Sequence, residues 1–115
     1  MVKLKLRRDE ARYVDDHFFP FMLMNAKQKL IYAENDTAEF NAKVILSLIS
    51  DVIVAFKRKL LSNANKFVFN FSNAHAICFY YLLLQQPIQP NLFYDVNLRQ
   101  HLVNVLHKII INPVL

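Results

Sequence analysis

The first residues in this sequence that could do chemistry are cations near its start. Lys3, Lys5 and Arg7 alternate with apolar residues, and Arg8 follows them directly. Alternate residues of a strand point to the same face, so we expect these cations to form one row. Such a row can bind the phosphates of a nucleic acid. Lysine on an exposed strand can equally serve to prevent edge-to-edge aggregation, and the acidic residues that follow weaken the positive field.

A second group of cations lies in the middle of the chain. It consists of Lys57, Arg58, Lys59 and Lys66. The first three fall in the last turn of a predicted helix, where positive charge complements the negative end of the helix dipole. We interpret this group as a solvated helix end rather than as a phosphate site.

Residue types that serve catalysis or bind metals occur without partners at a useful spacing. His101 and His107 are six residues apart, whereas two ligands on one helix face are typically four apart. His17 follows two aspartates, but no second ligand is identifiable. The single cysteine, Cys78, lies in an apolar segment, which favours an unreactive core thiol. We therefore predict no catalytic residues, no metal and no cofactor, and hence no enzyme.

The sequence contains no glycine. Phosphate-binding loops of the G-x-G-x-x-G and G-x-x-x-x-G-K-[ST] types and the G-x-S-x-G nucleophile elbow all need glycine, so these classes are excluded. Helices commonly end at a residue in the left-handed conformation, usually glycine and otherwise asparagine. We therefore expect asparagines near helix ends to take this role: Asn25, Asn63, Asn65 and Asn112.

The elements that would position these residues nearly repeat along the chain. Residues 2–14 and 67–79 both begin with a strict apolar-polar alternation and continue into helix-compatible sequence. Each copy predicts a strand, over 2–6 and 67–71, whose unpaired edge the other copy can cover. We predict a pseudo-twofold duplication of a strand and two helices, with halves at about 1–62 and 66–115. The strands would pair as a ribbon, within one chain or across a dimer.

Helical periodicity accounts for the rest of the chain. The strongest pattern predicts a helix over 37–61, with Asp51 on its solvated side. Before it, Pro20 should either end the first helix or lie in the first turn of a second one. Ser72 is suited to cap a helix over 73–86, and a last helix is expected over 92–111. The turn, cap and stop residues around this last helix are Pro87, Pro90, Asn91 and Pro113, and its expected inward residues are Val96, Val103, Leu106 and Ile110.

These patterns predict a mainly helical single domain over residues 1–115, with four to five helices and two short strands paired as a ribbon. The hydrophobic fraction is 55%, above the roughly 45–50% of ordinary globular domains, in which glycine is included. Such a chain has more apolar surface than a compact monomer hides. This excess favours a homo-oligomer or an apolar surface for a partner.

We therefore predict a small, non-catalytic interaction protein of the cytoplasm that forms homo-oligomers and binds a partner through an apolar, aromatic face. The candidate interface residues are Phe19, Phe21, Tyr80 and Tyr81. Tyrosine suits interfaces because its ring is apolar while its hydroxyl stays wet. No membrane segment or secretory signal is expected, since the apolar runs are short and the first residues alternate with charges.

The alternative function is DNA binding. A strand followed by two helices, doubled and paired through the strands, is similar in topology to ribbon-helix-helix proteins, whose two-stranded ribbon enters the major groove. In that case the residues that contact nucleic acid would be Lys3, Lys5, Arg7 and Arg8.

Overall fold

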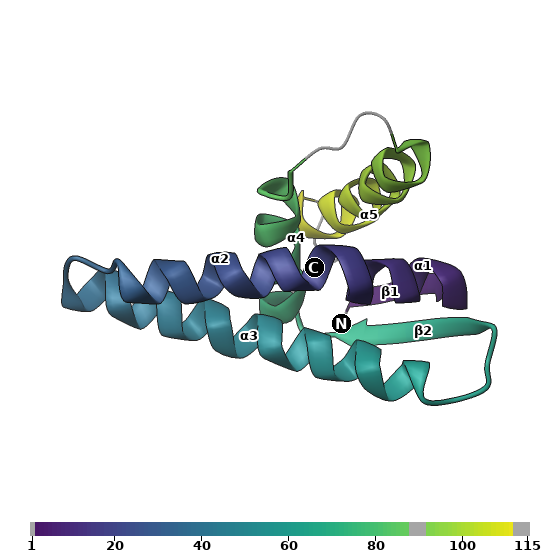
Figure 1. The fold of residues 1–115 in the computed structure, drawn as a ribbon, viewed down its shortest axis with the longest axis horizontal. Helices are drawn as coiled ribbons and strands as arrows, with labels where there is room; N and C mark the ends of the chain where they lie inside the picture. The colour runs from purple at the N-terminus through teal and green to yellow at the C-terminus, as the bar shows by residue number, and fades with distance from the viewer. Residues whose placement is uncertain (1, 88–91, 112–115) are drawn as a thin grey trace.

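The computed structural model describes residues 2–87 and 92–111 of the chain. The protein is mainly helical with a two-stranded antiparallel sheet, as the sequence predicts (Figure 1). The elements are β1 (Val2–Arg7), α1 (Arg8–Tyr13), the π-helical turn η1 (Val14–Phe18), α2 (Phe19–Ile31), α3 (Asp36–Leu60), β2 (Lys66–Phe71), α4 (Asn73–Leu84) and α5 (Phe93–Ile111). The expected turn, cap and stop residues Pro90, Asn91, Asn112 and Pro113 lie outside the described residues.

Strands β1 and β2 pair antiparallel within one chain, which confirms the predicted ribbon. Leu4 lies opposite Phe69, and Lys5 lies opposite Val68. Successive side chains of each strand alternate between two faces. The inner face is buried and consists of Val2, Leu4, Leu6, Phe67, Phe69 and Phe71. The twofold duplication stays a prediction, because α1, η1, α2 and α3 follow β1 whereas only α4 and α5 follow β2 in the described chain.

Helices α2 and α3 form a long antiparallel hairpin that extends away from the other elements (Figure 1). Helix α4 crosses this hairpin, and α5 packs against α4. The core lies where the inner face of the ribbon meets α2, α3 and α4. At its centre, the ring of Phe56 stacks on Phe69 at a centroid distance of 4.1 Å and meets Phe19 edge-on at 4.8 Å. The ribbon is therefore fixed against α3, and its outer face is left to solvent.

Pro20 lies in the first turn of α2, the second of the two arrangements that the sequence allowed. Helices α1 and α2 run into each other through the π-helical turn η1, where the Phe19 N–H donates to the Val14 carbonyl. A proline has no N–H for the carbonyl four residues earlier, and the wider turn before it accommodates this loss. The first helical segment consequently bends little and keeps one buried side across Pro20.

The helix ends do not use asparagine in the way expected. No described residue has a positive φ, and Asn25 lies inside α2 rather than at a helix end. The C-terminus of α3 is bound instead by a side chain from a distant part of the chain. The Arg8 guanidinium donates to the Leu60 carbonyl at 2.8 Å and to the Ala64 carbonyl at 3.1 Å, and also to that of Ser62. The bond to Leu60 satisfies a carbonyl that the helix end leaves without a partner, and the other two hold the loop that follows α3.

The buried side of α5 also differs from the expected one. Its inner face consists of Asp95, Leu98, Leu102 and Leu106. Val96 and Val103 are only partly buried, and the side chain of Ile110 lies outside the described residues. Asp95 can lie inside because the Tyr13 hydroxyl donates to its Oδ2 at 2.9 Å. This bond offsets part of the cost of burying the carboxylate, whose Oδ1 has no partner among the described residues.

Candidate nucleic-acid interface

The outer face of the ribbon presents six exposed side chains, four of them cationic. They are Lys3, Lys5 and Arg7 from β1, and Lys66, Val68 and Asn70 from β2. Across the ribbon, Lys3 lies opposite Asn70 and Arg7 lies opposite Lys66. Like charges directly opposite each other weaken a strand pair. The arrangement therefore concentrates positive charge at some cost to the ribbon itself.

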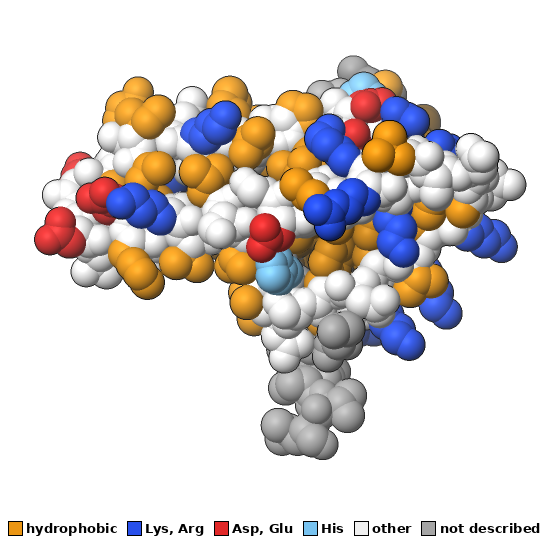
Figure 2. All heavy atoms as spheres, turned by 90° about the horizontal axis from the view of Figure 1, so that it is seen from below, with side chains coloured by type: hydrophobic (Ala, Val, Ile, Leu, Met, Phe, Trp, Pro, Cys, Tyr) orange, Lys and Arg blue, Asp and Glu red, His pale blue; other side chains and the backbone are white. Residues whose placement is uncertain are grey.

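The strand register also joins the two basic groups that are far apart in the sequence. One hollow beside the ribbon, of about 470 Å³, is lined by Arg58, Lys59 and Lys66 among others. A second, of about 530 Å³, is lined by Arg7, Arg12 and Lys66 among others. Lys66 belongs to both. Figure 2 shows most Lys and Arg side chains toward the end of the molecule where the ribbon lies, and a group of carboxylates at the opposite end.

Five of these cations are free to meet an external anion. Among the residues that the structure describes, no ion pair or hydrogen bond engages the charged groups of Lys3, Lys5, Arg58, Lys59 or Lys66. Since no described carboxylate pairs with these exposed charges, they add to one positive potential at this end of the molecule.

Arg7 and Arg8 are engaged within the chain, although the sequence grouped them with the lysines. Arg7 Nε donates to Asp9 Oδ1 at 3.0 Å, and this bond holds the pKa of Asp9 below its usual value. Arg7 therefore carries a partly compensated charge. Arg8 is occupied by the carbonyls at the end of α3, so its guanidinium has a structural role and leaves the candidate site.

The four candidate interface residues do not form one surface. Phe19 is 2% exposed and packs on Phe56, so its ring is not accessible to a partner. Phe21 and Tyr80 are half-buried, and the Tyr80 hydroxyl is hydrogen-bonded to His107 Nδ1 at 2.8 Å. Tyr81 alone among the four is exposed.

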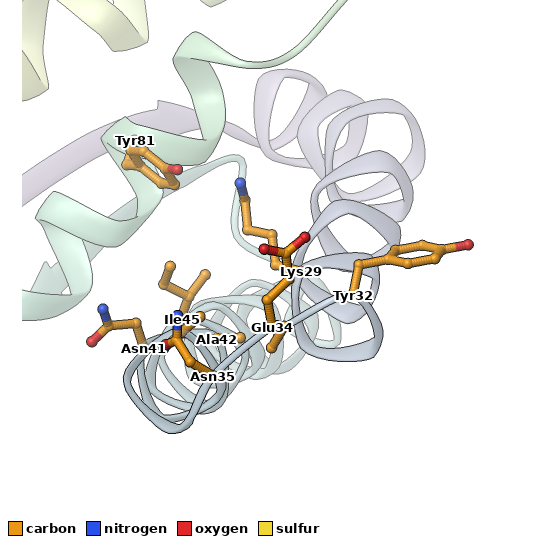
Figure 3. A pocket seen from close by; sticks show the side chains of 10 residues that line it. Lys29, Tyr32, Glu34, Asn35, Asn41, Ala42, Ile45 and Tyr81 are labelled. Carbon is orange, nitrogen blue, oxygen red and sulfur yellow. The ribbon is translucent and has the colours of Figure 1, made fainter.

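Tyr81 borders a hollow of about 540 Å³ beside the turn that joins α2 to α3. Figure 3 shows Tyr81 from α4 and Lys29 from α2 pointing toward each other, whereas Tyr32 points away. The Lys29 ammonium lies 5.4 Å from the centroid of the Tyr81 ring. Hydrogen bonds from Gln85 and Lys29 lower the pKa of the Tyr81 hydroxyl. The hollow is also lined by the small side chains of Ala38 and Ala42.

The fold also brings together Ser72, His75 and Asp51, which the sequence analysis did not connect. The Ser72 hydroxyl is hydrogen-bonded to His75 Nδ1, and His75 Nε2 to Asp51 Oδ2 at 2.9 Å. These residue types form catalytic triads, but there the aspartate is buried and orients the histidine. Here the Asp51 side chain is 64% exposed, and Ser72 caps α4 by accepting from the His75 N–H. We interpret the three residues as a link that fastens the start of α4 to α3.

Within residues 2–87 and 92–111, no group of three or more His, Cys, Asp or Glu side chains is placed to hold a metal ion. None of the helices there is both long enough and apolar enough to cross a membrane. Comparison of the chain with protein-family models, with curated proteins and with solved structures finds no match. The functional proposal therefore rests on the geometry of the basic ribbon.

Proposed function

We propose that the protein binds nucleic acid, with the outer face of the β1–β2 ribbon as the contact surface. The observation that carries this proposal is the convergence of two basic groups on one exposed ribbon, with five cations free of carboxylate partners in the described chain. Nucleic-acid interfaces are much more positively charged than protein interfaces, and phosphate neutralisation supplies most of their non-specific affinity.

The shape of the ribbon favours the major groove of duplex DNA. Its two strands lie about 4.8 Å apart, and a groove of about 12 Å admits a two-stranded ribbon. Asn70 would face the base edges, where asparagine pairs with adenine. The five free cations would bind phosphates: Lys3 and Lys5 on the ribbon, Lys66 at its end, and Arg58 and Lys59 beside it. The inner face cannot compete for this role because it is buried against the core.

The number of free cations sets the expected salt dependence. If all five neutralise a phosphate, log K falls with log salt with a slope of about −4.5. Affinity would then fall about 500-fold between roughly 50 and 200 mM salt. Replacing Lys3 and Lys5 leaves three phosphate contacts and a slope of about −2.7.

The experiment is fluorescence anisotropy with a labelled duplex of about 20 base pairs at several salt concentrations. The test variant is Lys3→Gln with Lys5→Gln, and the matched control is Lys27→Gln with Lys108→Gln, which removes the same charge from exposed positions on α2 and α5. We expect the first pair to weaken binding and flatten the slope, and the second to change both little. Equal effects of the two pairs would contradict the proposal, as would binding to phosphatidylserine vesicles without binding to DNA.

A further inference from the structure

Helix α3 also presents an exposed face on the side away from the core. Seven exposed residues recur along it at intervals of four or three: Asp36, Phe40, Lys43, Ser47, Asp51, Val54 and Arg58. With 3.6 residues per turn, these intervals keep all seven on one stripe. We call them the outer stripe of α3. Helix α3 runs along the outside of the molecule, below α2 in Figure 1.

The outer stripe is complementary to itself when two copies run in opposite directions. An antiparallel pair with Ser47 on the twofold axis places Asp36 of each copy opposite Arg58 of the other. The same register places Phe40 opposite Val54, and Lys43 opposite Asp51. Every charged residue of the stripe then faces an opposite charge, and the two apolar residues face each other. A parallel pair would instead place like charges together, which is unfavourable.

The properties of the individual side chains suit this contact. Phe40 is 67% exposed and Val54 is 45% exposed, so both leave apolar surface in water without a partner. Ser47 is small enough to let two helix axes approach to about 8–10 Å. The antiparallel arrangement also brings the positive end of one helix dipole to the negative end of the other. Asp51 keeps Oδ1 available while Oδ2 binds His75. Lys43 pairs with Glu39 at 3.0 Å within the helix, and its ammonium keeps further N–H donors for the other copy.

We propose that the partner of this stripe is a second copy of the chain, joined by an antiparallel α3–α3 contact around Ser47. The stripe spans about 33 Å, and one helix face of this length covers less than the roughly 800 Å² per partner of a standard interface. A dimer with a dissociation constant in the micromolar range is therefore expected. The contact leaves the outer face of the ribbon free, but it engages Arg58, one of the five cations of the proposed nucleic-acid interface, so a dimer would keep Lys3, Lys5, Lys59 and Lys66 for phosphates.

Sedimentation equilibrium from about 1 to 200 μM protein tests the dimer without nucleic acid. We expect Phe40→Ser to raise the dissociation constant at least about tenfold. The matched control is Phe93→Ser, because Phe93 is 81% exposed and lies at the start of α5, outside the stripe. Circular dichroism verifies that each variant keeps its helix content. A chain that stays monomeric over this whole concentration range would overturn the proposal, as would a dimer that both variants leave unchanged.

A charge exchange tests the register. Asp36→Lys alone places two cations opposite each other, and Arg58→Glu alone places two carboxylates opposite each other, so each variant should be monomeric. An equimolar mixture of the two variants restores opposite charges at both ends, and we expect it to dimerise. The double variant Asp36→Lys/Arg58→Glu should dimerise like the original chain. If the mixture contains no more dimer than either variant alone, the antiparallel register is overturned.

Discussion

Arg8 is the residue whose role differs most between sequence and structure, and its replacement tests the structural role directly. Its guanidinium donates to three carbonyls around the C-terminus of α3 and lies 5.9 Å from the centroid of the Phe67 ring. Arg8→Ala removes all of these contacts and leaves the Leu60 carbonyl without its side-chain donor. The variant should therefore lose stability rather than affinity for an anion.

The size of the effect depends on the number and setting of the bonds. A hydrogen bond with one charged partner contributes about 1.5–3 kcal/mol. Arg8 is half-buried, so water can replace part of what is lost, and the bonds share one side chain. We expect Arg8→Ala to lower the free energy of unfolding by about 2–3 kcal/mol in total. With a urea m-value of about 1.5 kcal/mol per M, the midpoint should fall by roughly 1.3–2 M.

The assay is urea unfolding followed by circular dichroism, with two comparisons. Lys5→Ala removes the same charge from the exposed face of the ribbon and should stay within about 0.5 kcal/mol of the original chain. Arg8→Lys keeps the charge but not the planar fork of donors, and should recover less than half of the loss. An Arg8→Ala midpoint equal to that of Lys5→Ala would refute the capping role.

Three further outcomes are expected. Asn35→Ala should lower the free energy of unfolding by about 1 kcal/mol, because the Asn35 side chain accepts a hydrogen bond from the Ala38 N–H at 2.8 Å at the start of α3. An unchanged midpoint of urea unfolding would contradict this cap. Burial, and then Asp95, raise the pKa of Tyr13 to about 12. The unfolded chain therefore releases this proton first, and stability should fall as the pH rises from about 10 to 12; Tyr13→Phe should flatten that fall, and an unaltered pH profile of the urea midpoint would count against the shift. Cys78 is buried and its thiol pKa is raised to about 11, so a disulfide reagent at a pH of about 8 should react far more slowly with the native than with the unfolded chain; equal rates would contradict its burial.

The ribbon and the long helix could be predicted because each depends on a pattern within a few residues. Apolar-polar alternation over 2–6 and 67–71 indicates two strands, and each of them buries its apolar positions. The helix predicted over 37–61 is α3, at Asp36–Leu60. In both cases one strong periodicity determines the type of element, and no knowledge of the neighbouring elements is needed.

Phe19 shows why part of the candidate surface could not be predicted. In a regular α-helix, Phe18 and Phe19 point in directions about 100° apart, so only one of two neighbours is expected in a core. The π-helical turn η1 adds a residue before α2 and rotates α2 relative to α1. Phe18 and Phe19 are consequently both buried. The periodicity of the sequence alone does not show that the buried face of α2 is rotated relative to a continuous helix.

The basic site was only half predictable for a related reason. Lys3 and Lys5 can be placed on the exposed face from the alternation of β1. Which residues of β2 lie beside them on that face depends on the strand register. The register that sets Lys66 against Arg7 is accompanied by the packing of Phe69 on Phe56, which is a contact between distant segments. The position of Arg8 at the end of α3 depends on the same docking.

The pairing of β1 with β2 has a consequence for how the chain folds. All of α1, α2 and α3 lies between the two strands, so ribbon closure carries the entropy of a long loop, whereas the α2–α3 hairpin closes across a short turn. We expect the α2–α3 hairpin to form early and β1 to pair with β2 last. In refolding experiments with pulsed hydrogen exchange, amides of α3 should become protected before those of β1. During synthesis, β1 would leave the ribosome first and wait unpaired until β2 has emerged.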